Sequence, residues 1–117
     1  MAELCQGPRK VVTVPGFDVP KGACDCHAHI IGPEVRFPFV EPRGFTPPDA
    51  LVGAYTAMLD TPGIERNVIV QPSVYGTDNS RTLAALIEMG AHRARGVAAI
   101  DETVSASELR ELDAAGF

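Results

Sequence analysis

The sequence predicts an α/β fold, the N-terminal part of a (β/α)8 TIM barrel with about three βα units. Apolar, strand-like runs alternate with amphipathic helical segments, which is typical of a parallel sheet with right-handed crossovers. The first strand is followed by histidines and a proline-rich loop, where a doubly wound sheet normally has a Gly-rich turn. A closed barrel typically needs about 250 residues. We therefore expect the 117 residues to form a truncated barrel that stops before the fourth strand.

The first elements are a lead-in, a strand and a long loop. Prolines and glycines recur through residues 1–22 and predict an extended surface lead-in, so that the partial barrel occupies residues 23–117. The apolar run at 23–31 ends at a Gly-Pro pair and predicts the first strand. Residues 32–48 contain five prolines, which exclude a helix and indicate a long irregular loop.

The next two segments predict a helix and then a strand. Apolar residues spaced three and four apart run from Leu51 to Leu59 and stop at residues 61–63, which indicates a helix. A Val-Ile-Val run between Asn67 and Gln71 is typical of a buried parallel strand.

The remainder of the chain predicts one more strand between two helices. Residues 82–89 have a helical apolar pattern, and residues 96–100 form a third apolar run. Residues 105–115 begin with the capping-box pair Ser105 and Glu108 and continue with an apolar stripe, which predicts the last helix.

Composition points to a globular protein that acts on a small molecule. The net charge is −5, hydrophobic residues make up 45%, and Lys and Arg do not cluster, so we expect no nucleic-acid partner and no membrane partner. No apolar run reaches the roughly 20 residues of a transmembrane helix, and the N-terminal residues lack the apolar core of a secretory signal, so a cytoplasmic location is expected. Three cysteines are too few for a disulfide framework.

Two histidines near the end of the first strand are the main candidates for catalysis. Strand alternation predicts that Asp25, His27 and His29 share one face. Imidazoles at positions i and i+2 can share one metal ion or present two donors to a substrate oxygen. Active sites of barrels form at the C-terminal ends of the strands, where this pair lies.

This segment allows two other interpretations. Histidines near a strand end can simply be packed core or rim residues. A zinc-finger-like set of Cys24, Cys26, His27 and His29 is disfavoured, because alternation divides these residues between two faces. The two cysteines are interpreted as small apolar groups that pack against helices.

A second polar group follows the second strand. Ser73, Tyr75 and Thr77 could each donate a hydrogen bond to a substrate carboxylate at the barrel mouth. The alternative is that this segment is only a turn in which Asp78 or Asn79 caps the next helix. We favour capping for Asp78 and Asn79, and substrate binding for Ser73.

Six short motifs occur in order along the chain. They lie at residues 22–29 (GACDCHAH), 32–33 (GP), 37–39 (FPF), 66–71 (RNVIVQ), 76–79 (GTDN) and 94–96 (ARG). This set resembles the amidohydrolase superfamily, in its amidohydrolase-related branch of pyrone-dicarboxylate and sugar-acid lactonases, over about residues 20–117. The resemblance implies a barrel hydrolase that opens small carboxylated lactones or sugar-acid lactones by adding water to the ring carbonyl.

The resemblance also assigns roles to individual residues. His27 and His29 match the family's first-strand pair, which binds a divalent, zinc-like metal or polarises the carbonyl without one, and Ser73 matches a substrate-side serine. A later histidine, carboxylate-binding arginines and an aspartate general base are expected beyond Phe117. A lactone isomerase, a zinc-dependent decarboxylase and an inactive barrel fragment are the alternatives. The resemblance is compatible with an oligomer.

Overall fold

A three-stranded parallel sheet forms the centre of the fold. The computed structural model describes residues 2–117. The strands are, in spatial order, β2 (Cys24–Ala28), β4 (Arg66–Val70) and β5 (Ala94–Val97). The helices are α1 (Val52–Asp60) between β2 and β4, α2 (Ser80–Met89) between β4 and β5, and α3 (Ala106–Ala115) after β5. The predicted alternation of strands and helices is confirmed.

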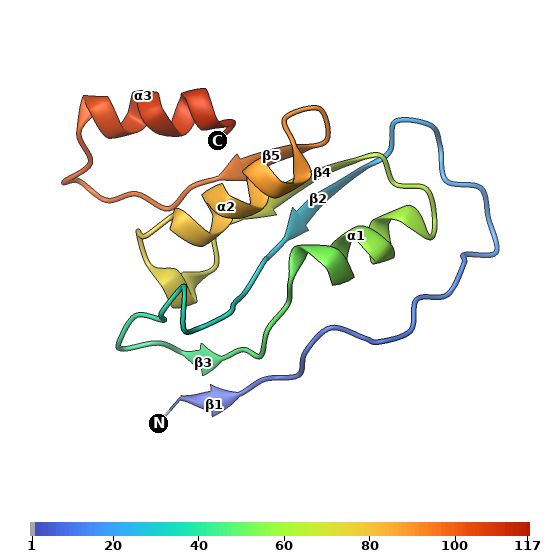
Figure 1. Ribbon diagram of the computed structural model, residues 1–117, viewed down its shortest axis with the longest axis horizontal. Helices are drawn as coiled ribbons and strands as arrows, with labels where there is room; N and C mark the ends of the chain where they lie inside the picture. Colours follow the sequence, from blue (N-terminus) through green and yellow to red (C-terminus); the bar gives the residue numbers. More distant parts are fainter. Residues whose placement is uncertain (1) are drawn as a thin grey trace.

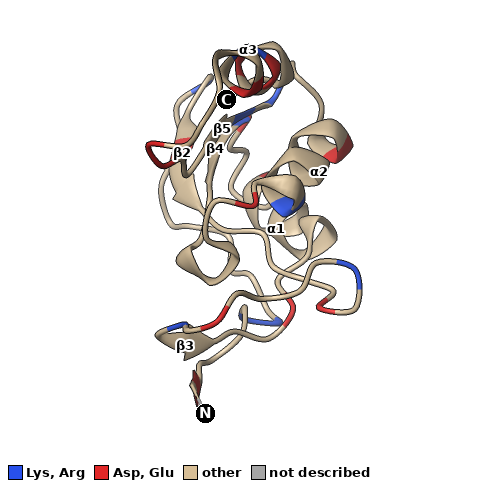
Figure 2. Ribbon diagram, turned by 90° about the vertical axis from the view of Figure 1, so that its left-hand side faces the viewer, with Lys and Arg blue, Asp and Glu red and all other residues tan. Residues whose placement is uncertain are grey.

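Helices α1 and α2 cover the same face of this sheet (Figures 1 and 2). The pairings of β2 with β4 and of β4 with β5 are both parallel. A barrel has all of its crossover helices on the outer face of its sheet, whereas a doubly wound sheet has helices on both faces. The described elements therefore confirm an α/β fold of the partial-barrel type.

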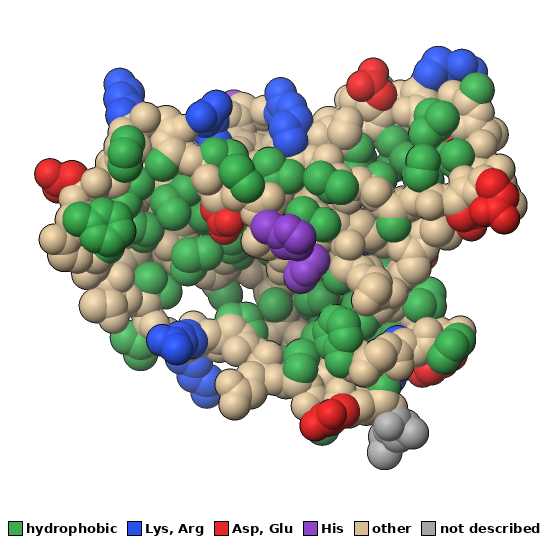
Figure 3. Space-filling model, turned by 180° about the vertical axis from the view of Figure 1, so that it is seen from behind, with side chains coloured by type: hydrophobic (Ala, Val, Ile, Leu, Met, Phe, Trp, Pro, Cys, Tyr) green, Lys and Arg blue, Asp and Glu red, His purple; other side chains and the backbone are tan. Residues whose placement is uncertain are grey.

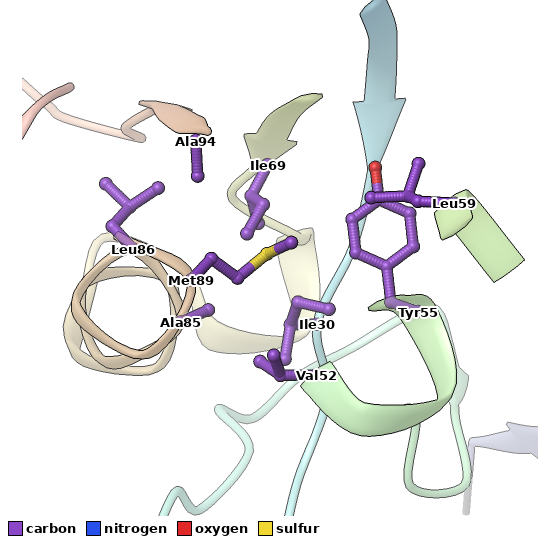
Figure 4. Close-up of a cluster of buried hydrophobic side chains, with 9 residues drawn as sticks. All are labelled: Ile30, Val52, Tyr55, Leu59, Ile69, Ala85, Leu86, Met89 and Ala94. Carbon is purple, nitrogen blue, oxygen red and sulfur yellow. The ribbon is translucent and has the colours of Figure 1, made fainter. Parts of the chain in front are cut away.

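The main hydrophobic core lies between the sheet and these two helices (Figure 4). Its buried side chains are Ile30, Val52, Tyr55, Leu59, Ile69, Ala85, Leu86, Met89 and Ala94. Leu59 and Ile69 are fully buried, and both belong to the apolar patterns that predicted α1 and β4. Burying one such side chain contributes about 1.5–3 kcal/mol, so this layer fixes the positions of the helices on the sheet.

The lead-in is joined to the proline-rich loop by a second, small sheet. Strand β1 (Glu3–Leu4) pairs in parallel with β3 (Phe45–Thr46). The sequence does not predict this pair, because two-residue strands are too short to show an alternating pattern. The pairing anchors the beginning of the chain beside the loop that follows β2.

The third strand begins two residues earlier and ends three residues earlier than predicted. The expected range was 96–100, whereas β5 spans Ala94–Val97. The Ala99 N–H donates to Oδ1 of Asn79, and Nδ2 of Asn79 donates to the Ala99 carbonyl, both at 2.9 Å. The side-chain amide thus takes the place of a neighbouring strand, and the second half of the apolar run lies outside the sheet.

Helix α3 begins as its sequence predicts. The Glu108 N–H donates to Oγ of Ser105 at 3.1 Å, and the Ser105 N–H donates to Oε2 of Glu108 at 2.7 Å. This reciprocal pair is the predicted capping box. The helix ends at Gly116, whose φ of 102° lies in the left-handed region that favours glycine.

Charged side chains are dispersed over the fold. Within residues 2–117, Lys and Arg occur on several elements and do not gather on one of them (Figure 2). This distribution agrees with the absence of a basic cluster in the sequence. None of the described helices is long and apolar enough to cross a membrane.

Candidate active site

His27 and His29 lie side by side at the C-terminal end of β2. Both side chains are exposed, and their ring centroids are 5.2 Å apart with an interplanar angle of 88°. Figure 3 shows two neighbouring histidine side chains on the face of the molecule turned away from α1 and α2. In a barrel this face points inward, so the pair has the position expected of catalytic groups.

A β-bulge in β2 changes the predicted orientation of Asp25. Asp25 pairs with Asn67 and Ala28 pairs with Ile69, so three steps along β2 match two steps along β4. Asn67 and Ile69 are buried on the helix side, which places Asp25 on that side as well. The prediction that Asp25 shares the face of the two histidines is therefore wrong, because strict alternation does not survive the extra residue.

The bulge also leaves Cys24 and Cys26 exposed. The interpretation that these cysteines pack against helices is wrong. The contact between this part of β2 and α1 is made by Asp25, whose Oδ2 accepts a 2.8 Å hydrogen bond from the Tyr55 hydroxyl. Burial, and then this hydrogen bond, raise the pKa of Tyr55 well above its usual range, so the hydroxyl stays protonated and remains a donor.

A backbone carbonyl fixes the His29 ring. Nδ1 of His29 lies 2.8 Å from the carbonyl oxygen of Val70, at the end of the neighbouring strand β4. A carbonyl oxygen can only accept, so Nδ1 carries the proton in this contact. In the neutral ring the lone pair is then on Nε2. The ring can accept a proton or ligate a metal through Nε2, and it can donate from Nε2 only as the imidazolium.

The two imidazoles fit part of a metal site. Their separation allows both rings to reach one ion at the usual Zn–N distance of about 2.0–2.1 Å. A carbonyl that orients a ligating histidine through Nδ1–H is a common feature of such sites. Within residues 2–117, no group of three or more His, Cys, Asp or Glu side chains could hold a metal ion. The pair therefore supplies two ligands at most.

Of the three predicted substrate donors, two are exposed and one is buried. Ser73 and Thr77 lie on the turn after β4 and are exposed, at the same end of the sheet as His29. Tyr75 is only 2% exposed, and its hydroxyl accepts a 2.8 Å hydrogen bond from the Gly32 N–H. Burial raises the pKa of Tyr75. Its hydroxyl therefore links this turn to the loop after β2.

Gln71 organises the same turn, a role that was not predicted from the sequence. Its Nε2 donates to the carbonyls of Gly76 and Asp78, at 3.1 and 2.8 Å, and its Oε1 accepts from the Thr82 hydroxyl at 2.6 Å. The side-chain nitrogen and oxygen of this 8% exposed residue thus both bond within the protein. The only sequence signal for this role is the position of Gln71, a polar residue directly after an apolar strand.

The two residues predicted to cap α2 have different roles. Oδ1 of Asp78 accepts the Ser80 N–H at 3.1 Å, which is the expected use of an acidic residue before a helix. Asn79 occupies the N-cap position but makes no side-chain cap hydrogen bond, because its amide is paired with Ala99. Asn79 thus ties the turn after β4 to the segment after β5.

A cavity of about 540 Å³ lies between the lead-in and α1. Its wall contains His29, Tyr55 and Arg9, and the rest is mostly apolar. The volume falls in the range of about 300–1,000 Å³ that is common for small-molecule sites. His29 lines this cavity and His27 does not, while both rings are exposed on the side of the sheet shown in Figure 3.

Comparisons with known proteins show which family the chain resembles. A family model described as amidohydrolase matches residues 24–117. The chain is 42% identical to a 4-sulfomuconolactone hydrolase from Rhizobium radiobacter, over 96% of this chain and 37% of the relative. It is 41% identical to a 2-pyrone-4,6-dicarboxylate hydrolase from Comamonas testosteroni, over 87% of this chain and 33% of the relative. The chain thus spans about a third of the length of the curated relatives it matches.

A solved structure shows the same fold. The crystal structure of a probable 2-pyrone-4,6-dicarboxylic acid hydrolase from Acinetobacter baumannii, with citric acid bound, matches with a TM-score of 0.75 and 30% identity. The match covers 81% of this chain and 35% of that chain. The described elements therefore have the fold of one part of that structure.

Proposed function

Because the chain belongs to the amidohydrolase family, we propose that the full-length protein hydrolyses small carboxylated lactones or sugar-acid lactones. The observation that carries this proposal is the pair of exposed imidazoles, 5.2 Å apart, on the inward face at the C-terminal end of β2. The names of the two curated relatives, both lactone hydrolases, support the choice of reaction.

The proposed reaction is the addition of water to the ring carbonyl. The water oxygen forms a bond to the carbonyl carbon and loses a proton, and the bond from that carbon to the ring oxygen breaks. The ring oxygen takes up a proton, so the product is a ring-opened hydroxy acid. We place His27 and His29 beside the carbonyl, where the Nε2 lone pair of a neutral His29 can accept a proton from the attacking water or ligate a metal ion.

The same pair would hold a divalent, zinc-like metal if the protein uses one. Such an ion supplies Lewis-acid polarisation of the carbonyl and a more acidic water. Without a metal, His29 must be an imidazolium to donate a hydrogen bond to the carbonyl oxygen, because its Nδ1–H is bound to Val70. Chelation followed by zinc addition separates these cases: activity that is lost and then restored identifies a metal site, and unchanged activity identifies the imidazoles acting alone.

Ser73 and Thr77 are proposed to bind the carboxylate of the substrate. Both are exposed hydroxyls on the turn after β4, where they approach the same end of the sheet as the histidines. Hydrogen bonds to a carboxylate are charge-assisted and contribute more than neutral ones. Tyr75 was grouped with them from the sequence, but we now propose a structural role for its hydroxyl.

Substitution of the histidines tests the proposal. In the full-length protein we expect His27→Ala and His29→Ala each to lower kcat/KM for 2-pyrone-4,6-dicarboxylate or 4-sulfomuconolactone at least about 100-fold. His92→Ala is the matched control, because this exposed histidine lies beyond α2. The assignment is contradicted if both histidine mutants retain turnover within about threefold of the parent.

NMR of the products distinguishes the proposed reaction from its alternatives. A hydrolase gives a ring-opened acid, an isomerase gives an isomerised lactone, and a decarboxylase gives carbon dioxide.

Residues 1–117 by themselves are proposed to be inactive. Strands β2 and β5 are the edges of the described sheet, and Val97 and Ile100 are about half exposed, at 48% and 50%. Unpaired edges and uncovered apolar side chains favour association over a closed site. Activity and size-exclusion profiles of residues 1–117 and of the full-length protein test this: an active, monodisperse piece contradicts it.

A further inference from the structure

The Asp25 carboxylate accepts two hydrogen bonds that meet at the bulge of β2. Oδ1 accepts the backbone N–H of His27 at 3.2 Å, and Oδ2 accepts the Tyr55 hydroxyl at 2.8 Å. The first bond is local, two residues along the chain, and the second reaches α1 across 30 positions of sequence. One carboxylate thus connects the backbone of a candidate catalytic residue to a helix.

The bulge decides where the two imidazoles lie. With strict alternation Asp25 would share the face of His27 and His29, and its carboxylate would not reach α1. The extra residue between Asp25 and Ala28 turns the carboxylate toward the helices, and both rings remain on the opposite face. The two bonds to Asp25 are made in this bulged conformation.

The two neighbours of Asp25 are themselves fixed. Tyr55 is 8% exposed and belongs to the main core, so its hydroxyl cannot move far without disturbing α1. On the other face, His29 is held by the Val70 carbonyl. Of the two imidazoles, His27 has its backbone set by the Asp25 bond and its ring beside His29.

We propose that Asp25 and Tyr55 form a clamp that positions His27 relative to His29, which makes Asp25 a positioning residue for the reaction on the opposite face of the sheet. The kinetic test of this inference rests on the proposed lactonase function. The structural test rests only on the geometry of the bulge. A group that acts through geometry changes kcat more than KM, because substrate still binds while the reacting groups are misplaced.

The test compares Tyr55→Phe, Asp25→Asn and Val52→Ala in the full-length protein. Tyr55→Phe removes one bond of the clamp and keeps the ring in the core. Asp25→Asn keeps an oxygen for the His27 N–H and loses the charge. Val52→Ala is the matched control, because it is a buried α1 residue, 7% exposed, outside the clamp.

We expect Tyr55→Phe and Asp25→Asn to lower kcat about 10- to 100-fold with KM within about threefold, while Val52→Ala loses stability without this loss of kcat. NMR supplies the structural readout: the assigned ring signals of His27 and His29 and the NOE between them should change in the clamp variants, with the His92 signals as the internal reference. Unchanged ring signals and kcat in Tyr55→Phe, or an equal loss of kcat in Val52→Ala, would overturn the clamp. A parent without lactonase activity refutes the proposed function instead, and the NMR comparison still decides the clamp.

Discussion

Replacing Tyr75 by phenylalanine separates a structural from a substrate-binding role for its hydroxyl. The substitution removes one oxygen from a side chain that is 2% exposed and leaves the ring among its aromatic neighbours, with Phe39 at a centroid distance of 5.5 Å. The buried Gly32 N–H, which now donates to this oxygen at 2.8 Å, then has no acceptor. A buried donor left without a partner costs about 1–3 kcal/mol. We expect the free energy of unfolding to fall by that amount.

Urea unfolding and steady-state kinetics of the full-length protein measure the two effects separately. If the hydroxyl is structural, Tyr75→Phe loses stability while KM for a carboxylated lactone stays close to that of the parent. Ser73→Ala, two residues away, is the matched control, because its exposed side chain should change the free energy of unfolding by no more than about 0.5 kcal/mol. Unchanged stability together with a raised KM in Tyr75→Phe would contradict a structural role for the hydroxyl and return Tyr75 to the substrate-binding group.

Three further predictions concern the site, the core and the last helix. Ser73→Ala should lower kcat/KM for a dicarboxylated lactone by about 1–2 kcal/mol, or about 5- to 30-fold, through the loss of one donor to the carboxylate; equal kinetics on several carboxylated lactones would argue for a structural loop. Leu59→Ala should destabilise the protein by about 2–5 kcal/mol in urea unfolding, because Leu59 is fully buried, and a loss below 1 kcal/mol would contradict the packing. The Ser105 N–H lowers the pKa of Glu108 below its ordinary value of 4.5, so the stability it gives α3 is present above pH 4.5 and is lost as the pH falls through the lowered pKa. Amide exchange of α3 should show this loss in the parent and not in Glu108→Gln.

The parts of the fold that could be predicted from sequence are those with a repeated or local signal. The apolar spacing in α1 and the capping box at Ser105 each report a structure that forms from near neighbours, and both were confirmed. The end of β5 and the β1–β3 pair depend on partners far along the chain. The Asn79 side chain that pairs with Ala99 is 20 residues away from it in the sequence. No pattern within the apolar run could therefore show where the backbone pairing of β5 ends.

The candidate site likewise has residues that local patterns predict and residues whose roles depend on distant partners. His27 and His29 were placed together because alternation and the strand end are local features. Tyr75 was assigned to the substrate because a hydroxyl in a polar turn looks available, although its partner, the Gly32 N–H, lies 43 positions earlier. Burial depends on the loop that packs over the turn, and this loop has no periodic pattern to reveal it.

For Asp25 the sequence contains a local signal, the spacing to the His27 N–H, but the simpler pattern of strand alternation predicts a different orientation. An aspartate side chain readily accepts the backbone N–H two residues later, and the His27 N–H lies at that distance in the sequence. An N–H that bonds to a side chain in this way is diverted from the pairing of neighbouring strands, and in β2 this bond coincides with the register shift between Asp25 and Ala28. Alternation assumes that every residue takes its place in the ladder, and it therefore predicts the wrong face for Asp25. The two spacings in this segment therefore have different consequences. The spacing of His27 and His29 places both rings on the open face. The spacing of Asp25 and His27 allows the side chain–backbone bond that accompanies the turn of Asp25 toward Tyr55.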